Sequence, residues 1–356
     1  MKRVVIVGGG VIGLFCAVRL RQGGAQVTVL EAEREHPSMH GPMASAAAAG
    51  MLAPIERQPS PHEQIALQSF ELWRERRAGA EWADGVNFDG VVILNQSGED
   101  AAAFARNAAR LGRSATPLNP NQVRKRTGLN AEIEHALFVE DEGVADPLRT
   151  LSGLTMQARA LGTIIEYEAD VASIAPGEAT THDGRVFSAD MVIVAPGVWA
   201  TEKIIAAAPA LKHVRPGKGQ MLAVTLQRRL GATVRGVGFY LAQRREDVVL
   251  GATMELDRFD RAIDPAKSEQ LFAAANAVLP GEVRPAGRAW AGLRPMSPDG
   301  WPMIGPAGEG VLVAAGHSRN GWLLAPITAE IISAYVFGAD VAPEWAALSP
   351  ARFEQS

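Results

Sequence analysis

A glycine-rich turn near the start of the chain constrains the fold more than any other feature. The turn spans residues 8–13 and reads Gly-Gly-Gly-Val-Ile-Gly. It follows the apolar run 4–7, and after it come a helical stretch at 14–20 and a second apolar run at 27–30 that leads into Glu31. This order predicts a dinucleotide-binding unit of an α/β fold, which consists of a strand, a glycine turn, a helix, a second strand and an acidic residue.

Each part of this unit has its own role. Gly8 permits a tight turn, Gly10 lets the backbone approach a pyrophosphate, and Gly13 lets the helix and strand pack closely. The phosphates would lie at the helix N-terminus, where free N–H groups and the helix dipole favour negative charge. Glu31, about 20 residues further on, is placed to accept hydrogen bonds from a ribose. A glycine turn in some other α/β fold is the alternative.

Composition narrows the class of protein. The chain has 356 residues, enough for two domains, with 47% hydrophobic and 21% charged residues. A net charge of −4 gives no reason to expect nucleic acid or an anionic membrane as a partner. The single cysteine, Cys16, excludes an internal disulfide and is expected to be a buried structural thiol. The histidines are scattered, so we expect no metal site.

The chain has no apolar run long enough to span a membrane, which takes about 20 residues. Its basic and apolar start lacks a small-residue cleavage site, so we expect a cytoplasmic protein. An amphipathic helix is expected over 62–82. Strands are expected around the Asp89-Gly90 turn, and a helix capped by Asp146 should run to about Leu161.

Two later segments have compositions that suit a flat ligand. Residues 44–54 are almost all small, which permits close approach, although a plain alanine helix is the alternative. Residues 316–321 form a second glycine-flanked turn between a predicted strand and a predicted helix. A helix N-terminus there would favour the edge of a flavin where negative charge gathers on reduction, and an ordinary capping loop is the alternative.

Five motifs, in order along nearly the whole chain, resemble the D-amino acid oxidase superfamily. Within it, the chain is most similar to the glycine oxidases of thiamine biosynthesis. The motifs are residues 8–13 with Glu31, residues 45–53, Trp-Ala-Gly-Leu-Arg-Pro at 290–295, Asp-Gly-Trp-Pro-Met-Ile-Gly at 299–305, and Ala-Gly-His-Ser-Arg-Asn-Gly at 315–321.

The resemblance implies an FAD-binding Rossmann-like domain of the glutathione-reductase type, interleaved with an α+β substrate domain built on an antiparallel sheet. A return to α/β character at 190–197, followed by alternating segments at 214–224, 237–242 and 248–254, agrees with interleaving. We expect the FAD domain at 1–82, 144–212 and 296–356, and the substrate domain at 83–143 and 213–295.

The resemblance also implies the chemistry. FAD would be bound non-covalently and would take a hydride at N5 from glycine, a related small amine or a D-amino acid. Oxygen would then reoxidise it, giving hydrogen peroxide. The imino acid would be hydrolysed to a 2-oxo acid and ammonia, or passed to a thiazole synthase. We expect a homo-oligomer. A D-amino acid dehydrogenase, a sarcosine-type oxidase and a non-catalytic nucleotide-binding module are the alternatives.

Three residues are candidates for catalysis. Arg294 matches the family's substrate arginine, and its planar fork suits a carboxylate; a surface ion pair is the alternative. Tyr240 matches a pocket tyrosine that can bond the same carboxylate. Arg319 could reach the flavin or the carboxylate, or serve only its own turn. Met51, Met254 and His317 are expected to line the substrate pocket, with His317 placed by geometry rather than acting as a base.

The remaining matches are cofactor contacts. Val171 matches a position whose backbone contacts the adenine, and the turn at 197–199 should close over the nucleotide. The expected FAD-binding residues are Gly8, Gly10, Val11, Ile12, Gly13, Glu31, Ser45, Ala46, Ala49, Gly50, Met51, Val171, Gly197, Trp199, Arg294, His317, Arg319, Asn320, Gly321, Trp322 and Leu323.

Overall fold

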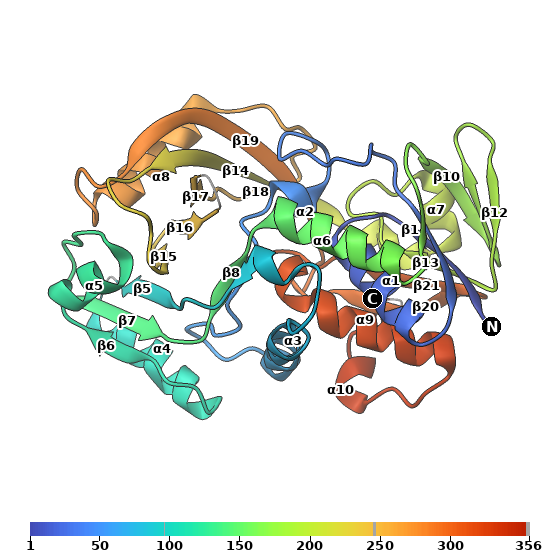
Figure 1. Ribbon diagram of the computed structural model, residues 1–356, viewed down its shortest axis with the longest axis horizontal. Helices are drawn as coiled ribbons and strands as arrows, with labels where there is room; N and C mark the ends of the chain where they lie inside the picture. The colour runs from blue at the N-terminus through green and yellow to red at the C-terminus, as the bar shows by residue number, and fades with distance from the viewer. Residues whose placement is uncertain (96, 245–246, 354–356) are drawn as a thin grey trace.

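The computed structural model describes residues 1–95, 97–244 and 247–353. The molecule is elongated and has two halves side by side (Figure 1). One half is built on a largely parallel sheet and carries both described ends of the chain, and the other is built on a large, mostly antiparallel sheet. The chain passes between the halves several times, so the predicted α/β and α+β parts are interleaved.

The parallel sheet has six strands in the order β20-β21-β13-β1-β2-β9. Four successive pairs run parallel and only β20 and β21 are antiparallel. The central strands are apolar and buried, as expected for a sheet covered on both faces. The strands are β1 (Arg3–Val7), β2 (Gln26–Leu30), β9 (Ile164–Glu166), β13 (Met191–Val194), β20 (Met303–Gly308) and β21 (Val311–Ala315).

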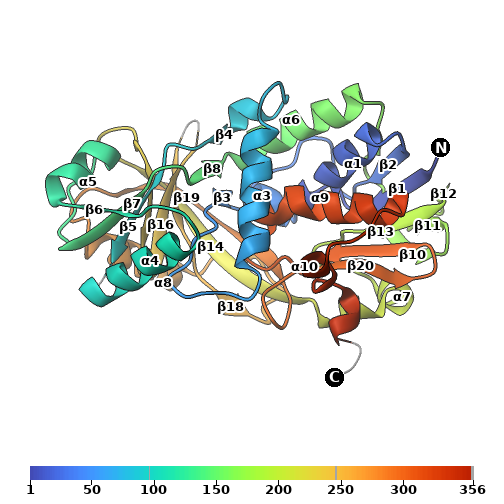
Figure 2. The ribbon, with the colours of Figure 1, turned by 90° about the horizontal axis from the view of Figure 1, so that it is seen from below.

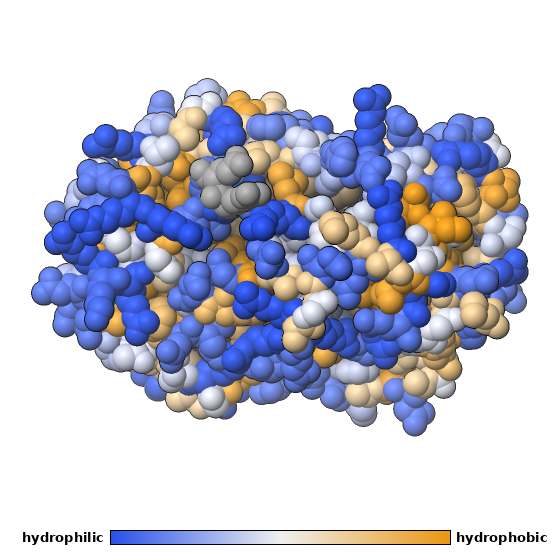
Figure 3. All heavy atoms as spheres, in the orientation of Figure 1, coloured by the Kyte–Doolittle hydropathy of each residue, from blue (hydrophilic) through white to orange (hydrophobic). Residues whose placement is uncertain are grey.

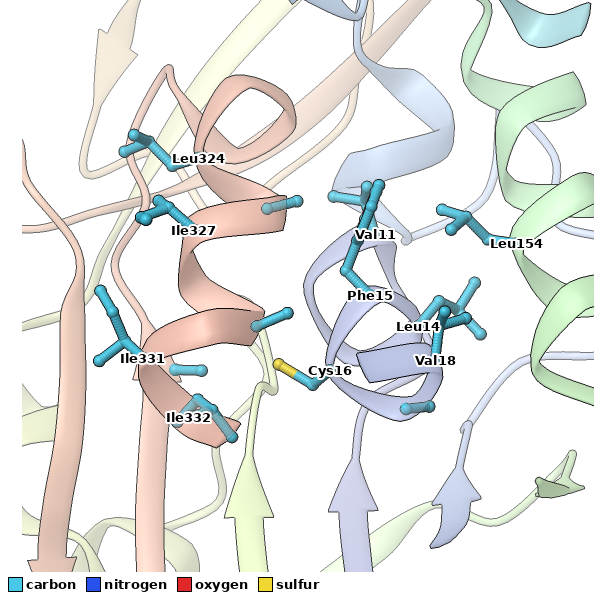
Figure 4. Packing of buried hydrophobic residues seen from close by; sticks show 14 of the residues in the cluster. Val11, Leu14, Phe15, Cys16, Val18, Leu154, Leu324, Ile327, Ile331 and Ile332 are labelled. Carbon is cyan, nitrogen blue, oxygen red and sulfur yellow. The ribbon is translucent and has the colours of Figure 1, made fainter. Parts of the chain in front are cut away.

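Helices α1 (Val11–Gln22) and α9 (Gly321–Phe337) pack against each other beside this sheet (Figure 2). Cys16 lies between them, with its sulfur directed toward Ile331 and Ile332 (Figure 4). Burial raises the pKa of the Cys16 thiol to about 12, so the thiol stays protonated. The expected buried structural thiol is confirmed.

Other helices around this half differ from expectation mainly in length. α6 (Pro147–Ala160) begins as predicted, with the side chain of Asp146 accepting from the N–H of Arg149. The helix predicted over 62–82 is shorter and ends at Glu75, as α3 (Glu63–Glu75). The chain turns at Gly79, whose φ of +74° is left-handed and incompatible with a continuing helix.

A small antiparallel sheet flanks the parallel one. It contains β10 (Val171–Ala175), β11 (Glu178–Thr181) and β12 (Val186–Ser188), with a turn at Asp183-Gly184. Other short elements are α7 (Glu202–Ala207), α10 (Pro343–Ala346) and the 3₁₀ turns η1 (Ala83–Gly85), η2 (Pro209–His213) and η3 (Pro350–Phe353).

The large sheet has nine strands, and its long strands β14 and β19 pair antiparallel along most of their length. Its strands are β5 (Val91–Asn95), β6 (Thr116–Leu118), β7 (His135–Val139), β14 (Arg215–Thr225), β15 (Thr233–Gly236), β16 (Phe239–Gln243), β17 (Val248–Gly251), β18 (Glu255–Leu256) and β19 (Arg284–Met296). Helices α4 (Gly98–Arg110), α5 (Pro120–Thr127) and α8 (Pro265–Asn276) accompany them.

A second small sheet, β3 (Met51–Leu52), β8 (Gly143–Ala145) and β4 (Val86–Asn87), lies where the halves meet. The strands expected around Asp89-Gly90 therefore do not pair with each other: β4 pairs with β8, and β5 pairs with β7 and β15. The alanine-rich segment forms one helical turn, α2 (Ala44–Ala47), rather than a long helix.

The predicted interleaved α/β fold is confirmed. The domain boundaries themselves stay a prediction, and residues 354–356 of the last predicted segment lie outside the described residues. The face seen in Figure 3 is mostly hydrophilic, with hydrophobic residues in small groups. Across the described ranges, no helix combines the length and apolarity that a membrane crossing requires.

Candidate functional site

A cavity of about 410 Å³ opens at the carboxyl ends of the parallel strands. Gly8 follows β1, Glu31 follows β2, Ala195 follows β13, and His317 lies just beyond β21; all four line the cavity. In open α/β sheets this edge is where ligands bind. The cavity also reaches Arg294 on β19, so it joins the parallel sheet to the large sheet.

The glycine turn is needed for close packing beside this cavity. Gly8 has a φ of +103°, and a Cβ there would lie 2.3 Å from the carbonyl oxygen of Ala195. A Cβ on Gly13 would lie 1.9 Å from the carbonyl oxygen of Gly8, so the helix and strand touch there. Gly10 caps α1 and lines the cavity, so the N-terminus of the helix lies at this wall, where the N–H of Val11 donates to Oγ of Ser45 at 3.1 Å.

Glu31 is a buried carboxylate on the cavity wall, with only 8% of its surface exposed. Its Oε2 accepts from the N–H of Gly9 at 2.6 Å, and its Oε1 accepts from the N–H of Glu33 at 2.9 Å. Burial raises its pKa, and these backbone hydrogen bonds oppose the rise. Each oxygen keeps a further lone pair, so the carboxylate can also accept from ligand hydroxyls.

Arg294 brings a cation to the other end of the cavity. Its Nη1 donates to the carbonyl oxygen of Thr253 at 3.2 Å and lies 3.8 Å from Sδ of Met254. Burial lowers the pKa of this guanidinium, the nearby Arg319 lowers it further, and Tyr240 opposes the change. Among the described residues no Asp or Glu forms an ion pair with Arg294, so the surface ion pair considered above is absent there.

Tyr240 lies on the same sheet, in register with Gly251 of β17, which in turn pairs with Met221 of β14. A Cβ on Gly251 would lie 2.2 Å from the tyrosine hydroxyl. Burial raises the pKa of Tyr240, while Arg294 and Arg244 act against the rise. The hydroxyl is therefore protonated at neutral pH and can donate a hydrogen bond.

His317 lines the cavity but its ring is engaged elsewhere. Nε2 lies 3.0 Å from Oγ1 of Thr328, and that hydroxyl donates to the carbonyl oxygen of Leu324 at 2.8 Å. Because the Thr328 hydroxyl donates its proton to Leu324, it can only accept from His317. This favours a neutral His317 ring that carries its proton on Nε2 and donates it to Thr328. Burial lowers the pKa of His317 to about 3. This geometry agrees with a structural role for His317 at the cavity wall rather than a role as general base.

The cavity brings together predicted residues from widely separated parts of the chain. The predicted site residues on its wall are Gly8, Gly10, Val11, Ile12, Glu31, Ser45, Val171, Gly197, Trp199, Arg294, His317, Arg319, Gly321 and Trp322. Trp199 and Arg319 are exposed at this wall.

Other predicted site residues do not line the cavity. Ala46 and Leu323 pack into the hydrophobic core, and Met51, Ala49 and Tyr240 pack together at the junction of the halves. Gly13 serves the packing of α1 as described. The remaining members of this group are Gly50, Met254 and Asn320. Their predicted roles in binding stay predictions.

Some residues of the site were not predicted individually from the sequence. Pro42 and Met43 line the cavity, and so do Ala44 and Ala48, which lie inside the small-residue segment expected to approach a flat ligand. On the facing sheet, Gly292 leaves space for α2: a Cβ there would lie 2.7 Å from Cβ of Ala47. The signal was present, because glycine inside a strand pattern marks close approach of another group.

Comparison with known proteins identifies the family. The family model for FAD dependent oxidoreductases, DAO, matches residues 3–335. The chain is 32% identical to the bifunctional protein ThiO/ThiG of Synechocystis sp. over 98% of its length, and it spans about half (54%) of that relative. It is 28% identical to the glycine oxidase of Bacillus licheniformis, covering 96% of this chain and 94% of that protein.

Solved structures agree. The crystal structure of glycine oxidase from Geobacillus kaustophilus matches with a TM-score of 0.84 and 27% identity, covering 99% of both chains. L-proline dehydrogenase from P. horikoshii has the same fold at 21% identity and a TM-score of 0.84.

The chain belongs to the FAD dependent oxidoreductase family. Its cavity fits this cofactor: a glycine turn in which side chains cannot fit, the N-terminus of α1 and a buried carboxylate lie along one wall. These comparisons confirm FAD as the cofactor and an FAD-dependent amino acid oxidase as the class of enzyme.

Proposed function

We propose that the protein oxidises glycine or a closely related small amino acid. The observation that carries the proposal is Arg294, a part-buried guanidinium on the cavity wall with no carboxylate partner among the described residues. A desolvated guanidinium that lacks a protein carboxylate suits a ligand carboxylate, which it can bind through two parallel hydrogen bonds. The names of the glycine oxidases of Bacillus licheniformis and Geobacillus kaustophilus support glycine as the substrate.

The cofactor would lie along the wall formed by the glycine turn, Glu31 and the loop at 316–321. Glu31 would accept from the ribose hydroxyls, and the N-terminus of α1 would face the phosphates. When bound, FAD supplies the acceptor for a hydride from the substrate α-carbon, and oxygen then takes up the electrons.

The protein's own residues bind and orient the amino acid. Arg294 would hold the carboxylate, and the protonated hydroxyl of Tyr240 would donate to the same group. Hydride loss from a neutral amine needs no base at the α-carbon, which agrees with a neutral His317 bonded to Thr328. Small side chains at 44–49 limit this part of the wall to backbone, methyl groups and the hydroxyl of Ser45.

For glycine the balanced reaction takes one amino acid, one water and one oxygen molecule. It yields glyoxylate, ammonia and hydrogen peroxide, with the imine as the species before hydrolysis. Direct transfer of that imine to a thiazole synthase is a further part of the proposal. It is supported by the Synechocystis relative, which joins a ThiO part to a ThiG part in one chain. We also propose a homo-oligomer and the two-domain division given above.

The test is a substrate panel. Initial rates of peroxide release should be measured on the FAD-loaded protein with glycine, sarcosine and several D-amino acids. We expect the highest kcat/KM for glycine or sarcosine. Reduction of the flavin by these substrates without peroxide release, but with transfer to a quinone, would identify a dehydrogenase instead.

A further inference from the structure

The backbone around α2 is held by side chains from both halves of the molecule. The carbonyl oxygen of Ser45 accepts from Nε1 of Trp322 at 3.2 Å, and that of Ala47 accepts from Nε1 of Trp290 at 2.8 Å. The carbonyl oxygen of Ala48 accepts from Nη2 of Arg244 at 2.6 Å. Ser45 and Ala48 line the cavity, so these bonds fix part of its wall.

The same segment is fixed on its other side by β8. The N–H of Ala145 donates to the carbonyl oxygen of Gly50 at 2.8 Å. Gly50 has a φ of +75°, and a Cβ there would lie 1.9 Å from the carbonyl oxygen of Ala145. The segment 48–50 is therefore held between β8 and the guanidinium of Arg244.

Arg244 follows β16 directly and is buried, with 6% of its surface exposed. Its guanidinium carbon lies 5.1 Å from the ring centroid of Trp290, so the cation covers an aromatic face. Its Nε and Nη1 have no hydrogen-bond partner within the described part of the chain. Burial lowers its pKa, and the charges of Asp146 and Asp247 oppose this most strongly.

A buried cation that makes a single hydrogen bond is costly unless its position serves a purpose. Arg244 joins three parts of the candidate site. It bonds the cavity-lining Ala48, it covers the ring of Trp290 that bonds Ala47, and its charge acts on Tyr240. Nothing in this arrangement brings Arg244 onto the cavity wall, which consists of other residues.

We propose that Arg244 is a positioning residue for the oxidation: with Trp290 it holds the 47–48 backbone at the distance from the flavin and substrate that hydride transfer needs. This inference rests on the proposed function. Arg294 remains the carboxylate ligand, so loss of the Arg244 guanidinium disturbs the reaction step and leaves carboxylate binding in place.

The test compares Arg244→Met, Arg244→Lys and the control Arg288→Met in the FAD-loaded protein. The exposed Arg288 pairs with Asp247 at 2.7 Å and does not line the cavity. Three quantities are measured: the rate of anaerobic flavin reduction, the affinity for glycolate from the change in the flavin spectrum, and the visible spectrum itself.

For Arg244→Met we expect the reduction rate to fall on the order of 10- to 100-fold, since a misplacement of about 1 Å can cost that much. Glycolate affinity should change less than threefold, and the flavin bands should shift. Arg244→Lys should recover part of the rate, because an ammonium can bond the Ala48 carbonyl over the same ring. Arg288→Met should match the wild type.

Two outcomes would overturn the inference. Glycolate affinity falling as far as the rate would make Arg244 a direct ligand, and an unchanged rate and spectrum would remove it from the site. If Arg244→Met does not fold, Trp290→Phe, which loses the N–H that bonds Ala47 and keeps a smaller aromatic ring beside Arg244, must lower the rate in the same way. Failure of the wild type to be reduced by any amino acid would instead refute the proposed function. The shift of the flavin bands in Arg244→Met would still test whether Arg244 positions the 47–48 backbone next to the flavin.

Discussion

The guanidinium of Arg294 occupies the space that a side chain at position 219 would need. A Cβ on Gly219 would lie 2.2 Å from Nη1 and 2.3 Å from Nη2 of Arg294. Gly219 is on β14 and pairs with Gly292 of β19, two residues before Arg294, so the guanidinium lies across the neighbouring strand. The absence of a side chain at 219 is what lets the cation lie against the sheet at the cavity wall.

Gly219→Ala is therefore expected to move the Arg294 guanidinium without unfolding the sheet, because the displaced atoms are the end of a flexible side chain. We expect unchanged FAD binding and a loss of kcat/KM on the order of 100-fold, the scale of a misplacement of about 1 Å. In an Arg294→Ala background the same change should have almost no further effect. Equal losses in both backgrounds would mean that Gly219 acts by another route.

Arg294→Lys keeps the charge and loses the planar fork. We expect kcat/KM for amino acid substrates to fall, with a loss of transition-state stabilisation of about 2–4 kcal/mol. This is the scale for losing a buried charged hydrogen bond. FAD affinity should stay the same. Glycolate should perturb the flavin spectrum of the wild type and bind the variant far more weakly. If glycolate binds both proteins equally, Arg319 becomes the leading candidate for the carboxylate.

Glu31→Ala removes the carboxylate that holds the N–H groups of Gly9 and Glu33 at the cavity wall. We expect the binding free energy of FAD to weaken by about 1.5–3 kcal/mol, because hydrogen bonds to a charged acceptor are lost. This corresponds to a roughly ten- to hundredfold lower affinity. The variant loaded with excess FAD should turn over normally. Reconstitution of the apoprotein measures this, and an unchanged affinity would exclude Glu31 as the ribose ligand.

The raised pKa of the buried Glu142 makes the stability of the protein depend on pH. It is fully buried, its Oε1 accepts from the N–H of Ile55 at 3.0 Å, and burial raises its pKa from 4.5 to about 7. Between these two values the unfolded chain releases the proton while the folded chain keeps it. The free energy of unfolding contributed by this group therefore falls as pH rises through the window, by about 1.4 kcal/mol per unit.

Glu142→Gln removes the ionisation and can keep the bond to Ile55. We expect its Tm, relative to the wild type, to be higher at pH 8 than at pH 5. Glu134→Gln is the control, because that side chain is 93% exposed and should show no such difference. A Tm difference for Glu142→Gln that is the same at both pH values would contradict the raised pKa.

The parts of the site that depend on local pattern were predictable from the sequence. The turn at residues 8–13 and Glu31 form one continuous unit whose spacing carries its geometry, and the Asp146 cap follows the same logic. The pairing of β4 with β8 was not predictable in this way, because the partners are more than fifty residues apart and the Asp89-Gly90 turn fits a hairpin equally well.

The facing sheet was harder still. The resemblance supplied Arg294 and Tyr240, but the register that puts Gly219 beneath one and Gly251 beneath the other comes from pairing of strands distant in sequence. Arg244 had no signal of its own, since an arginine at the end of a strand is usually exposed. Its burial depends on Trp290 and the 47–48 backbone, which three separate segments bring together.

The central claim is that this protein transfers electrons from a small amino acid to bound FAD and then to oxygen. The most direct test is anaerobic titration of the purified FAD-loaded protein with glycine, followed by admission of air. The account predicts that the visible flavin absorption bleaches, then returns with release of one hydrogen peroxide per flavin. A flavin that stays oxidised with glycine, sarcosine and a panel of D-amino acids would contradict it.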